Sequence, residues 1–204
     1  IIIQIVYYFF SYFKIENEDK KVNFSVPTGN FGDIYAGYIA KKMGLPINKL
    51  IIATNSNDIL KRVIKTGIYK PQKVEQTVSP SMDIQVASNF ERLIFDAYSN
   101  DSSKVLKLMD DLKSNGEFAL EKEELKKINA DFCSESLSES ETKLIINKVY
   151  KNQSILIDPH TAVGVGVAEK MSLEGNTIIL STAHPSKFSD VVMQETNVKP
   201  ELPD

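Results

Sequence analysis

The sequence of 204 residues contains a single cysteine, Cys133. One cysteine excludes an internal disulfide, which favours a reduced compartment, so we expect a cytoplasmic protein. A nucleophilic role for Cys133 would require a nearby histidine or another feature that lowers the pKa of its thiol. No motif in the sequence supplies one, and we therefore do not expect a catalytic cysteine.

Clustered positive charge and metal-binding motifs are also lacking. The net charge is -3, and 24 lysine and arginine residues are spread along the chain. Because a nucleic-acid backbone is bound by a clustered basic face, no nucleic-acid partner is expected. The two histidines, His160 and His184, are far apart in the sequence and belong to no cysteine or carboxylate motif, so no metal site is expected.

The apolar segment 1–13 is too short to cross a membrane, because a transmembrane helix needs about 20 residues. It also lacks the basic front and small-residue cleavage site of a signal peptide. We predict no membrane partner, but a core helix that is covered on all sides because it is apolar on all sides. The first residue is Ile1 rather than Met, so we expect a partial or processed chain whose apolar start would expose core surface by itself.

Beyond residue 20, segments with strand and helix patterns alternate. Short apolar runs predict buried strands, and apolar residues three and four apart predict helices. Such alternation indicates an α/β fold, a parallel sheet with helices on both faces, in which ligands bind beyond the carboxyl ends of the strands. The strands are expected at 22–26, 50–53, 154–157 and 177–180, and the helices at 33–43, 59–65, 161–171 and 185–194.

The middle of the chain has a different pattern, with charged helices and few apolar runs. Residues 71–80 are expected to form a loop and residues 134–136 a polar turn. We interpret residues 86–151 as a mostly helical insertion with solvated charged faces, after which the α/β pattern returns over 154–204. The helices of this block are expected at 89–98, 103–113, 121–127 and 139–150.

The segment Val26–Gly37, which joins the first expected strand to the first expected helix, carries the strongest chemical signal. Gly29 and Gly32 let the backbone turn tightly and approach an anion, while Thr28 and Asn30 add side-chain donors. Several amides would then point at one spot in front of the positive end of the helix, which favours a phosphate. An ordinary strand–helix turn without a ligand is the alternative.

The loop matches neither nucleotide motif. A nucleotide loop would contain Gly-Lys-Ser or Gly-Lys-Thr, and the dinucleotide fingerprint Gly-x-Gly-x-x-Gly is absent here as well. A small phosphate monoester held by main-chain amides fits better. Asp33 would place a carboxylate near this anion, so its side chain must point away or bind a loop amide or a hydroxyl.

Five blocks of the sequence, in the same order, resemble the threonine synthase family. Together they extend from about residue 4 to about residue 192, which makes them far more specific than one loop. The blocks are Thr28–Asp33 with Ala36–Gly37 and Lys41–Pro46, then Ile52–Asp58, Pro80–Ile84, Asp158–Gly164 and Ser181–Phe188.

The resemblance implies an enzyme of pyridoxal-phosphate fold type II, with pyridoxal 5′-phosphate as cofactor. It also implies that the hydroxyl of Thr182 faces the pyridine nitrogen of that cofactor. A neutral hydroxyl there would hydrogen-bond the nitrogen without protonating it fully. By the same resemblance, the cofactor phosphate is bound by Gly29, Asn30, Phe31, Gly32 and Asp33.

The implied reaction converts O-phospho-L-homoserine and water to L-threonine and phosphate, as a carbon–oxygen lyase. We expect that Thr54, Asn55, His160 and Lys187 contact this substrate. For Lys187, a solvated position on a helix is an equal alternative.

The family's cofactor-binding lysine stands in a Phe-Lys-Asp context that this sequence does not contain. We expect that lysine upstream, so the isolated chain should be inactive. A catalytically silent protein that keeps the phosphate loop as a binding module is one alternative. Another fold-type-II enzyme, such as a serine or threonine dehydratase, is a second, although the blocks Asp158–Gly164 and Ser181–Phe188 argue against it. The sequence leaves open whether the protein is a monomer or a homodimer.

Overall fold

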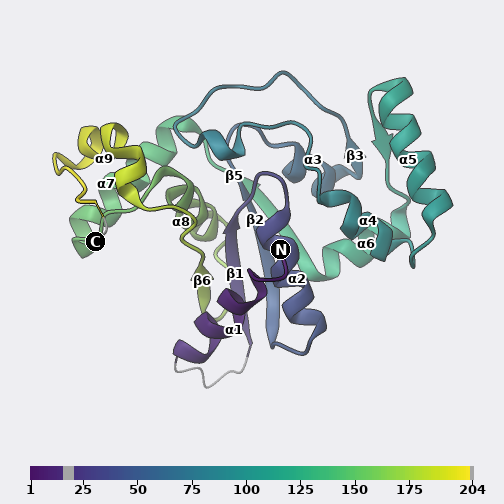
Figure 1. Ribbon diagram of the computed structural model, residues 1–204, viewed down its shortest axis with the longest axis horizontal. Helices are drawn as coiled ribbons and strands as arrows, with labels where there is room; N and C mark the ends of the chain where they lie inside the picture. Colours follow the sequence, from purple (N-terminus) through teal and green to yellow (C-terminus); the bar gives the residue numbers. More distant parts are fainter. Residues whose placement is uncertain (16–20, 203–204) are drawn as a thin grey trace.

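A four-stranded parallel sheet forms the centre of the chain (Figure 1). The computed structural model describes residues 1–15 and 21–202. The strand order is β5-β2-β1-β6, and every neighbouring pair is parallel. The predicted α/β class with a parallel sheet is therefore confirmed. The strands are β1 (Val22–Pro27), β2 (Ile47–Thr54), β5 (Phe132–Ser136) and β6 (Thr177–Ile179).

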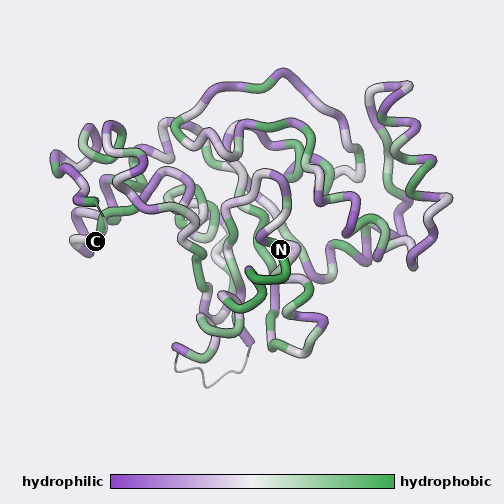
Figure 2. Tube along the Cα trace, in the orientation of Figure 1, coloured by the Kyte–Doolittle hydropathy of each residue, from purple (hydrophilic) through white to green (hydrophobic). Residues whose placement is uncertain are grey.

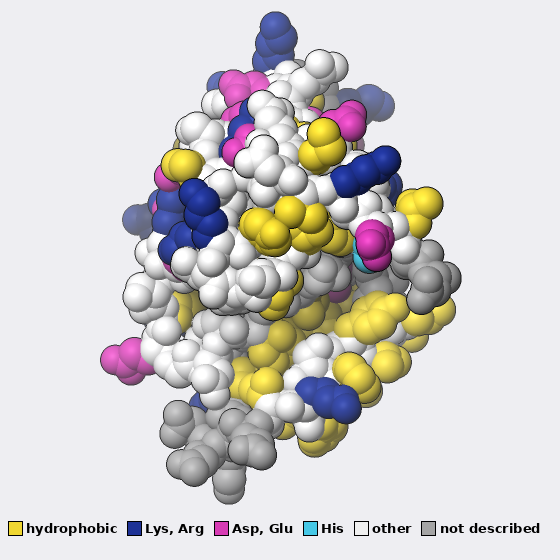
Figure 3. Space-filling view, turned by 90° about the vertical axis from the view of Figure 1, so that its left-hand side faces the viewer, with side chains coloured by type: hydrophobic (Ala, Val, Ile, Leu, Met, Phe, Trp, Pro, Cys, Tyr) yellow, Lys and Arg dark blue, Asp and Glu magenta, His cyan; other side chains and the backbone are white. Residues whose placement is uncertain are grey.

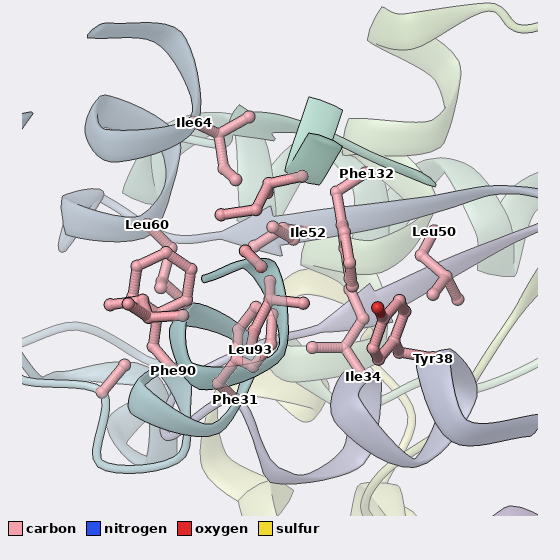
Figure 4. Packing of buried hydrophobic residues seen from close by; sticks show 14 of the residues in the cluster. Phe31, Ile34, Tyr38, Leu50, Ile52, Leu60, Ile64, Phe90, Leu93 and Phe132 are labelled. Carbon is pink, nitrogen blue, oxygen red and sulfur yellow. The ribbon is translucent and has the colours of Figure 1, made fainter. Parts of the chain in front are cut away.

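Helices cover both faces of this sheet, and the side chains of the central strands are therefore buried on both sides. One face packs residues such as Phe24 and Ile52 against α2 (Gly32–Lys42), α3 (Ile59–Thr66) and the helices beyond them (Figure 4). The other face packs Ile51 and Ala53 against two further helices. These are α7 (Glu139–Gln153) and α8 (Pro159–Met171).

The remaining elements surround these two layers. A short antiparallel pair, β3 (Ile68–Tyr69) with β4 (Phe118–Ala119), was not predicted, because two residues carry no periodicity. It is stabilised by the stacked rings of Tyr69 and Phe118, 4.8 Å apart. The others are α1 (Ile5–Lys14), η1 (Pro80–Met82), α4 (Phe90–Ala97), α5 (Ser102–Asn115), α6 (Lys122–Asp131), η2 (Pro185–Phe188) and α9 (Ser189–Thr196).

Two secondary-structure predictions are wrong. Residues 134–136, expected as a turn, belong to the edge strand β5, so the block 86–151 contributes a strand to the main sheet. Its polar side chains have partners, as in the 2.9 Å bond from Ser134 Oγ to the carbonyl of Ile52. Residues 154–157, expected as a strand, are irregular: Ser154 ends α7 in a left-handed conformation and Ile155 is half exposed.

The prediction of a fully covered N-terminal helix is also wrong. In α1 only Tyr8 is buried, whereas Ile2, Ile3 and Phe13 are at least 74% exposed. Figure 2 shows that this segment is predominantly hydrophobic, and Figure 3 shows hydrophobic side chains gathered on the lower part of one face. Among the described residues, no helix combines the length and the hydrophobicity that crossing a membrane requires.

The edge strand β5 gives a testable pH dependence through Glu135. Burial acts to raise the pKa of this carboxyl, but hydrogen bonds from Lys61 and Lys65 outweigh it and lower the pKa from 4.5 to about 2. A lowered folded-state pKa stabilises the fold above the unfolded value, and this stability is lost as the pH falls from about 5 towards 2. Near the surface the effect is about 1 kcal/mol.

We therefore expect the free energy of unfolding of the wild-type chain to fall more steeply below pH 5 than that of Glu135→Gln. Urea unfolding at several pH values measures this difference. Glu123→Gln is the matched control, because Glu123 is an exposed carboxylate on α6. If the free energy of unfolding depended on pH in the same way for wild type and Glu135→Gln, the ion pairs of Glu135 with Lys61 and Lys65 would have no stabilising role.

Candidate functional site

The loop between β1 and α2 opens onto a cavity of about 600 Å³ at the carboxyl end of the strand. Distant parts of the sequence meet here, because the carboxyl ends of parallel strands share one edge of the sheet. The walls comprise residues 27–34 from the loop, Ser81 and Met82 from η1, His160 from α8, 180–183 after β6, Lys187 from η2, and Gln4 and Tyr7 near α1.

Phe31 fixes the shape of the loop. Its φ of 65° lies in the left-handed region, which a bulky side chain rarely adopts. Its ring is buried and packs edge-on against Phe90 at 5.2 Å and tilted against Phe132 at 5.7 Å (Figure 4). The buried ring thus holds a strained backbone in place, as is common at ligand-binding loops.

The strained residue leaves several main-chain amides of the loop unpaired. The amides of Asn30, Phe31 and Gly32 have no acceptor among the described residues. A left-handed residue followed by the right-handed first turn of a helix curls consecutive amides towards one side, a geometry that binds anions. The main-chain and side-chain amides of Asn89 donate to the carbonyl oxygen of Asn30 at 3.1 and 2.9 Å. Asn89 thereby holds this carbonyl oxygen away from the unpaired loop amides.

Thr28 does not act as the expected side-chain donor. Its hydroxyl donates to the carbonyl of Val26 at 2.6 Å, and its amide donates to the carbonyl of Ala53 at 2.8 Å. The single hydroxyl proton is therefore used inside the loop. Thr28 serves to attach the start of the loop to the ends of β1 and β2.

Asp33 binds a hydroxyl, one of the two arrangements that the sequence required. The Tyr8 hydroxyl donates to the Asp33 main-chain oxygen at 2.8 Å and to its Oδ1 at 3.2 Å. Burial raises the pKa of the Asp33 carboxyl, and the hydrogen bond from Tyr8 partly offsets this. Burial, together with the charge of Asp33, also raises the pKa of Tyr8. The pair connects α1 to the first turn of α2.

Gly37 makes room for this connection, and its replacement gives a second prediction. A Cβ at position 37 would lie 2.7 Å from the ring carbon Cζ of Tyr8 and 2.9 Å from Leu50 Cδ2. We expect Gly37→Ala to lower the free energy of unfolding by about 1–3 kcal/mol, because the ring of Tyr8 is fully buried and has to move. Urea denaturation tests this, and an unchanged midpoint would contradict the packing of α1 on α2.

The structure brings most of the other predicted site residues to the cavity. Thr182 and Lys187 are exposed and line it, and Lys187 forms no ion pair with any described residue. His160 also lines it but is buried, with both ring nitrogens hydrogen-bonded inside the protein. The second histidine, His184, lies outside this cavity wall.

Thr54 and Asn55 do not line the cavity. Both are buried, and Asn55 Nδ2 donates to Asp83 Oδ1 at 2.8 Å and to Ser79 Oγ at 3.0 Å. These contacts connect the end of β2 to the residues on both sides of η1. In this structure they hold that segment, and the contact of Thr54 and Asn55 with a substrate stays a prediction.

The comparisons with known proteins agree over almost the whole chain. The family "Threonine synthase, C-terminal" matches residues 161–204. The threonine synthase of Saccharomyces cerevisiae is 46% identical over 94% of this chain. The crystal structure of a PLP-bound threonine synthase from Brucella melitensis is 47% identical over 99% of this chain, with a TM-score of 0.95. The chain belongs to the threonine synthase family.

The chain spans less than half the length of these relatives. It covers 41% of the Saccharomyces cerevisiae threonine synthase and 44% of the Brucella melitensis chain. A threonine deaminase from Solanum lycopersicum, 12% identical with a TM-score of 0.55, shows the same fold-type-II architecture and no more. The threonine synthases are thus the closer group for this chain, both in sequence and in structure.

Several cavity residues were not predicted individually. Ser81, Met82 and Ser181 line the cavity although none of them was expected to bind a ligand. A signal was present, because all three lie in blocks that resemble threonine synthases. Gln4 and Tyr7 had no such signal. They reach the cavity because α1 packs on α2, and only the tertiary structure reveals that contact.

Proposed function

We propose that this chain forms part of the catalytic region of a threonine synthase, a cytoplasmic carbon–oxygen lyase that uses pyridoxal 5′-phosphate. The complete protein would convert O-phospho-L-homoserine and water to L-threonine and phosphate. One observation carries the proposal: the amides of Asn30, Phe31 and Gly32, which have no acceptor among the described residues, border the same cavity as Thr182.

The phosphate group of the cofactor fits the loop. Main-chain amides in front of α2 supply hydrogen bonds together with the positive end of the helix dipole. The Asp33 carboxyl is engaged by Tyr8 of α1, and burial raises its pKa, which disfavours the charged form that would repel the anion. A cavity of about 600 Å³ is within the usual range for a cofactor or small-molecule site.

Thr182 would hold the other end of the cofactor. When bound, pyridoxal phosphate supplies an electron sink that stabilises negative charge on substrate carbon atoms. Thr182 lines the cavity, and among the described residues its hydroxyl has no partner. A hydroxyl can hydrogen-bond the ring nitrogen without transferring a full charge to it, which would moderate the sink.

Lys187 is proposed to bind the phosphate or carboxylate of the substrate. No other lysine or arginine appears among the described residues that line the cavity, and its Nζ lies 5.8 Å from the centre of the Phe188 ring. We expect Lys187→Met to raise KM for O-phosphohomoserine about 10- to 100-fold, the effect of losing one charged hydrogen bond. Cofactor affinity should stay unchanged.

Steady-state kinetics and a cofactor titration measure the two quantities for Lys187→Met. Lys151→Met is the control, because Lys151 is an exposed lysine at the end of α7 that does not line the cavity. An unaltered KM would leave Lys187 as a solvated residue. A loss of cofactor affinity would place it at the cofactor instead.

The complete coding sequence to which this chain belongs provides the decisive experiment. We expect that it encodes a lysine in a Phe-Lys-Asp context and that its product releases phosphate and forms threonine from O-phosphohomoserine. A product that binds the cofactor without releasing phosphate would be a silent binding module. Ammonia release from serine or threonine would indicate a dehydratase.

A further inference from the structure

A carboxylate at the start of α8 accepts more hydrogen bonds than helix capping requires. Asp158 is fully buried and is the N-cap residue of α8. It accepts hydrogen bonds from the amides of His160 and Thr161 at 2.8 and 3.4 Å, as capping requires. It also binds two side chains: His160 Nδ1 at 2.9 Å and the hydroxyl of Thr161. The additional contacts fix the orientation of both side chains.

The contacts of His160 define its tautomer. The amide of Ser81 donates to Nε2 at 3.2 Å, so Nε2 carries no proton. Nδ1 therefore carries the ring hydrogen and donates it to Asp158 Oδ1. The ring is 3% exposed and lies 4.8 Å from the Phe188 ring. In this arrangement His160 offers no proton to a ligand, although it borders the cavity.

Ser81, which His160 holds, lies against the phosphate loop in the cavity wall. A Cβ at position 29 would lie 2.5 Å from the Ser81 carbonyl oxygen and 3.4 Å from Met82 Cα. The loop and η1 thus touch at Gly29 without spare room. The position of η1, to which the hydrogen bond from Ser81 to His160 contributes, limits where the loop amides can lie.

Thr161 makes the corresponding contact with the part of the cavity wall that contains Ser181 and Thr182. Its hydroxyl, bound to Asp158, also lies 3.3 Å from the hydroxyl oxygen of Ser181. Ser181 immediately precedes Thr182, which lines the cavity. One buried carboxylate therefore connects, through two side chains, to the wall at Gly29 and to the wall at Thr182.

We propose that Asp158, His160 and Thr161 are positioning residues that set the separation between the phosphate loop and Thr182. His160 acts through the amide of Ser81, and Thr161 acts through Ser181. The inference deepens the proposed function, because the ligand whose two ends meet these walls is the proposed cofactor. The role of His160 also has a signature that is independent of any ligand, namely its tautomer.

The first test is nitrogen NMR of the complete protein labelled with ¹⁵N-histidine. The signals that disappear in His160→Gln belong to His160. We expect them to report a neutral ring protonated at Nδ1 at neutral pH. A ring protonated at Nε2, or a positively charged ring, would exclude the Ser81 contact and overturn the proposal.

The second test separates positioning from direct contact by side-chain length. The amide oxygen of glutamine reaches about as far as Nε2 and can accept from Ser81, whereas asparagine reaches only as far as Nδ1. We expect His160→Gln to keep the affinity for pyridoxal phosphate within about threefold. His160→Asn and His160→Leu should weaken it at least about tenfold, with kcat falling less than the affinity. His184→Asn, at the other histidine, is the control: it keeps an acceptor for the Ser186 amide that caps η2, and it should leave the affinity unchanged.

Equal affinities for all three His160 variants and wild type would refute the role of His160, and an equal loss in all three would show direct ligand contact instead. A wild-type protein that binds no pyridoxal phosphate would refute the proposed function but not decide this inference. In that case hydrogen exchange of the Ser81 amide decides it: the amide should stay protected in His160→Gln and exchange faster in His160→Leu. Equal exchange rates in both variants would overturn it.

Discussion

Phe31→Ala is expected to lower the free energy of unfolding by about 3–5 kcal/mol, the usual cost of deleting a fully buried phenylalanine ring. The ring is 1% exposed and contacts Phe90 and Phe132. Its loss leaves a cavity and also removes the buried ring that helps to hold the left-handed backbone at this position. Affinity for pyridoxal phosphate should fall with it, because the loop amides lose their common direction.

Urea unfolding and a cofactor titration measure the two effects of Phe31→Ala. Phe95→Ala is the control, because Phe95 lies on α4 and is 39% exposed, and it should cost less than about 1 kcal/mol. Phe31→Gly isolates the backbone strain, since glycine adopts the left-handed region without the penalty of about 1–2 kcal/mol that alanine carries. The glycine variant should therefore be the more stable of the two. The opposite order would show that position 31 is not strained.

The sequence was sufficient to place the loop between β1 and α2, because local signals decide that part of the fold. An apolar run that ends at Pro27 predicts a strand, and the residues that follow Gly32 predict a helix. The glycines between them mark a tight turn. The structure has this strand and this helix, with bounds shifted by one residue.

The sequence could not show how the loop is held, because its supports are distant contacts. The buried ring of Phe31, the Ser81 carbonyl beside Gly29 and the Tyr8 hydroxyl on Asp33 all depend on tertiary packing. Asn55 is the converse case. It was expected to contact the substrate, and the structure shows its amide bound to the segment around η1.

The errors in secondary structure have a similar cause. Strand β5 is polar because it is an edge strand, where Glu135 forms ion pairs with lysines of α3 instead of packing in a core. Residues 154–157 are apolar enough for a strand but lie between two helices without a neighbouring strand. An apolar segment indicates that its residues are buried, but it does not show whether they pair with a strand. Strand pairing depends on which segments lie side by side in the fold.

Gly29→Ala is expected to weaken the binding of pyridoxal phosphate at least about tenfold and to lower the free energy of unfolding by about 1–3 kcal/mol. The added Cβ would meet the Ser81 carbonyl at 2.5 Å. Both partners are main chain, so neither can turn aside as a side chain would. The loop or η1 has to move, and the cavity changes shape with it. A cofactor titration and urea unfolding of the same variant measure both effects.

Gly32→Ala is the matched control for stability, because the sequence marks both positions as loop glycines and the structure leaves room for a Cβ at position 32 only. A Cβ at position 32 would meet only Asn89 Nδ2 at 3.5 Å and Ile1 Cγ1 at 3.9 Å, which are ordinary contacts. At the first position of α2, alanine should keep or slightly raise stability, since it reduces the freedom of the unfolded chain. If Gly29→Ala binds the cofactor as tightly as wild type, the contact between the loop and η1 does not shape the site. If Gly32→Ala alone loses affinity at full stability, the phosphate lies against position 32 rather than in the space bounded by Gly29 and Ser81.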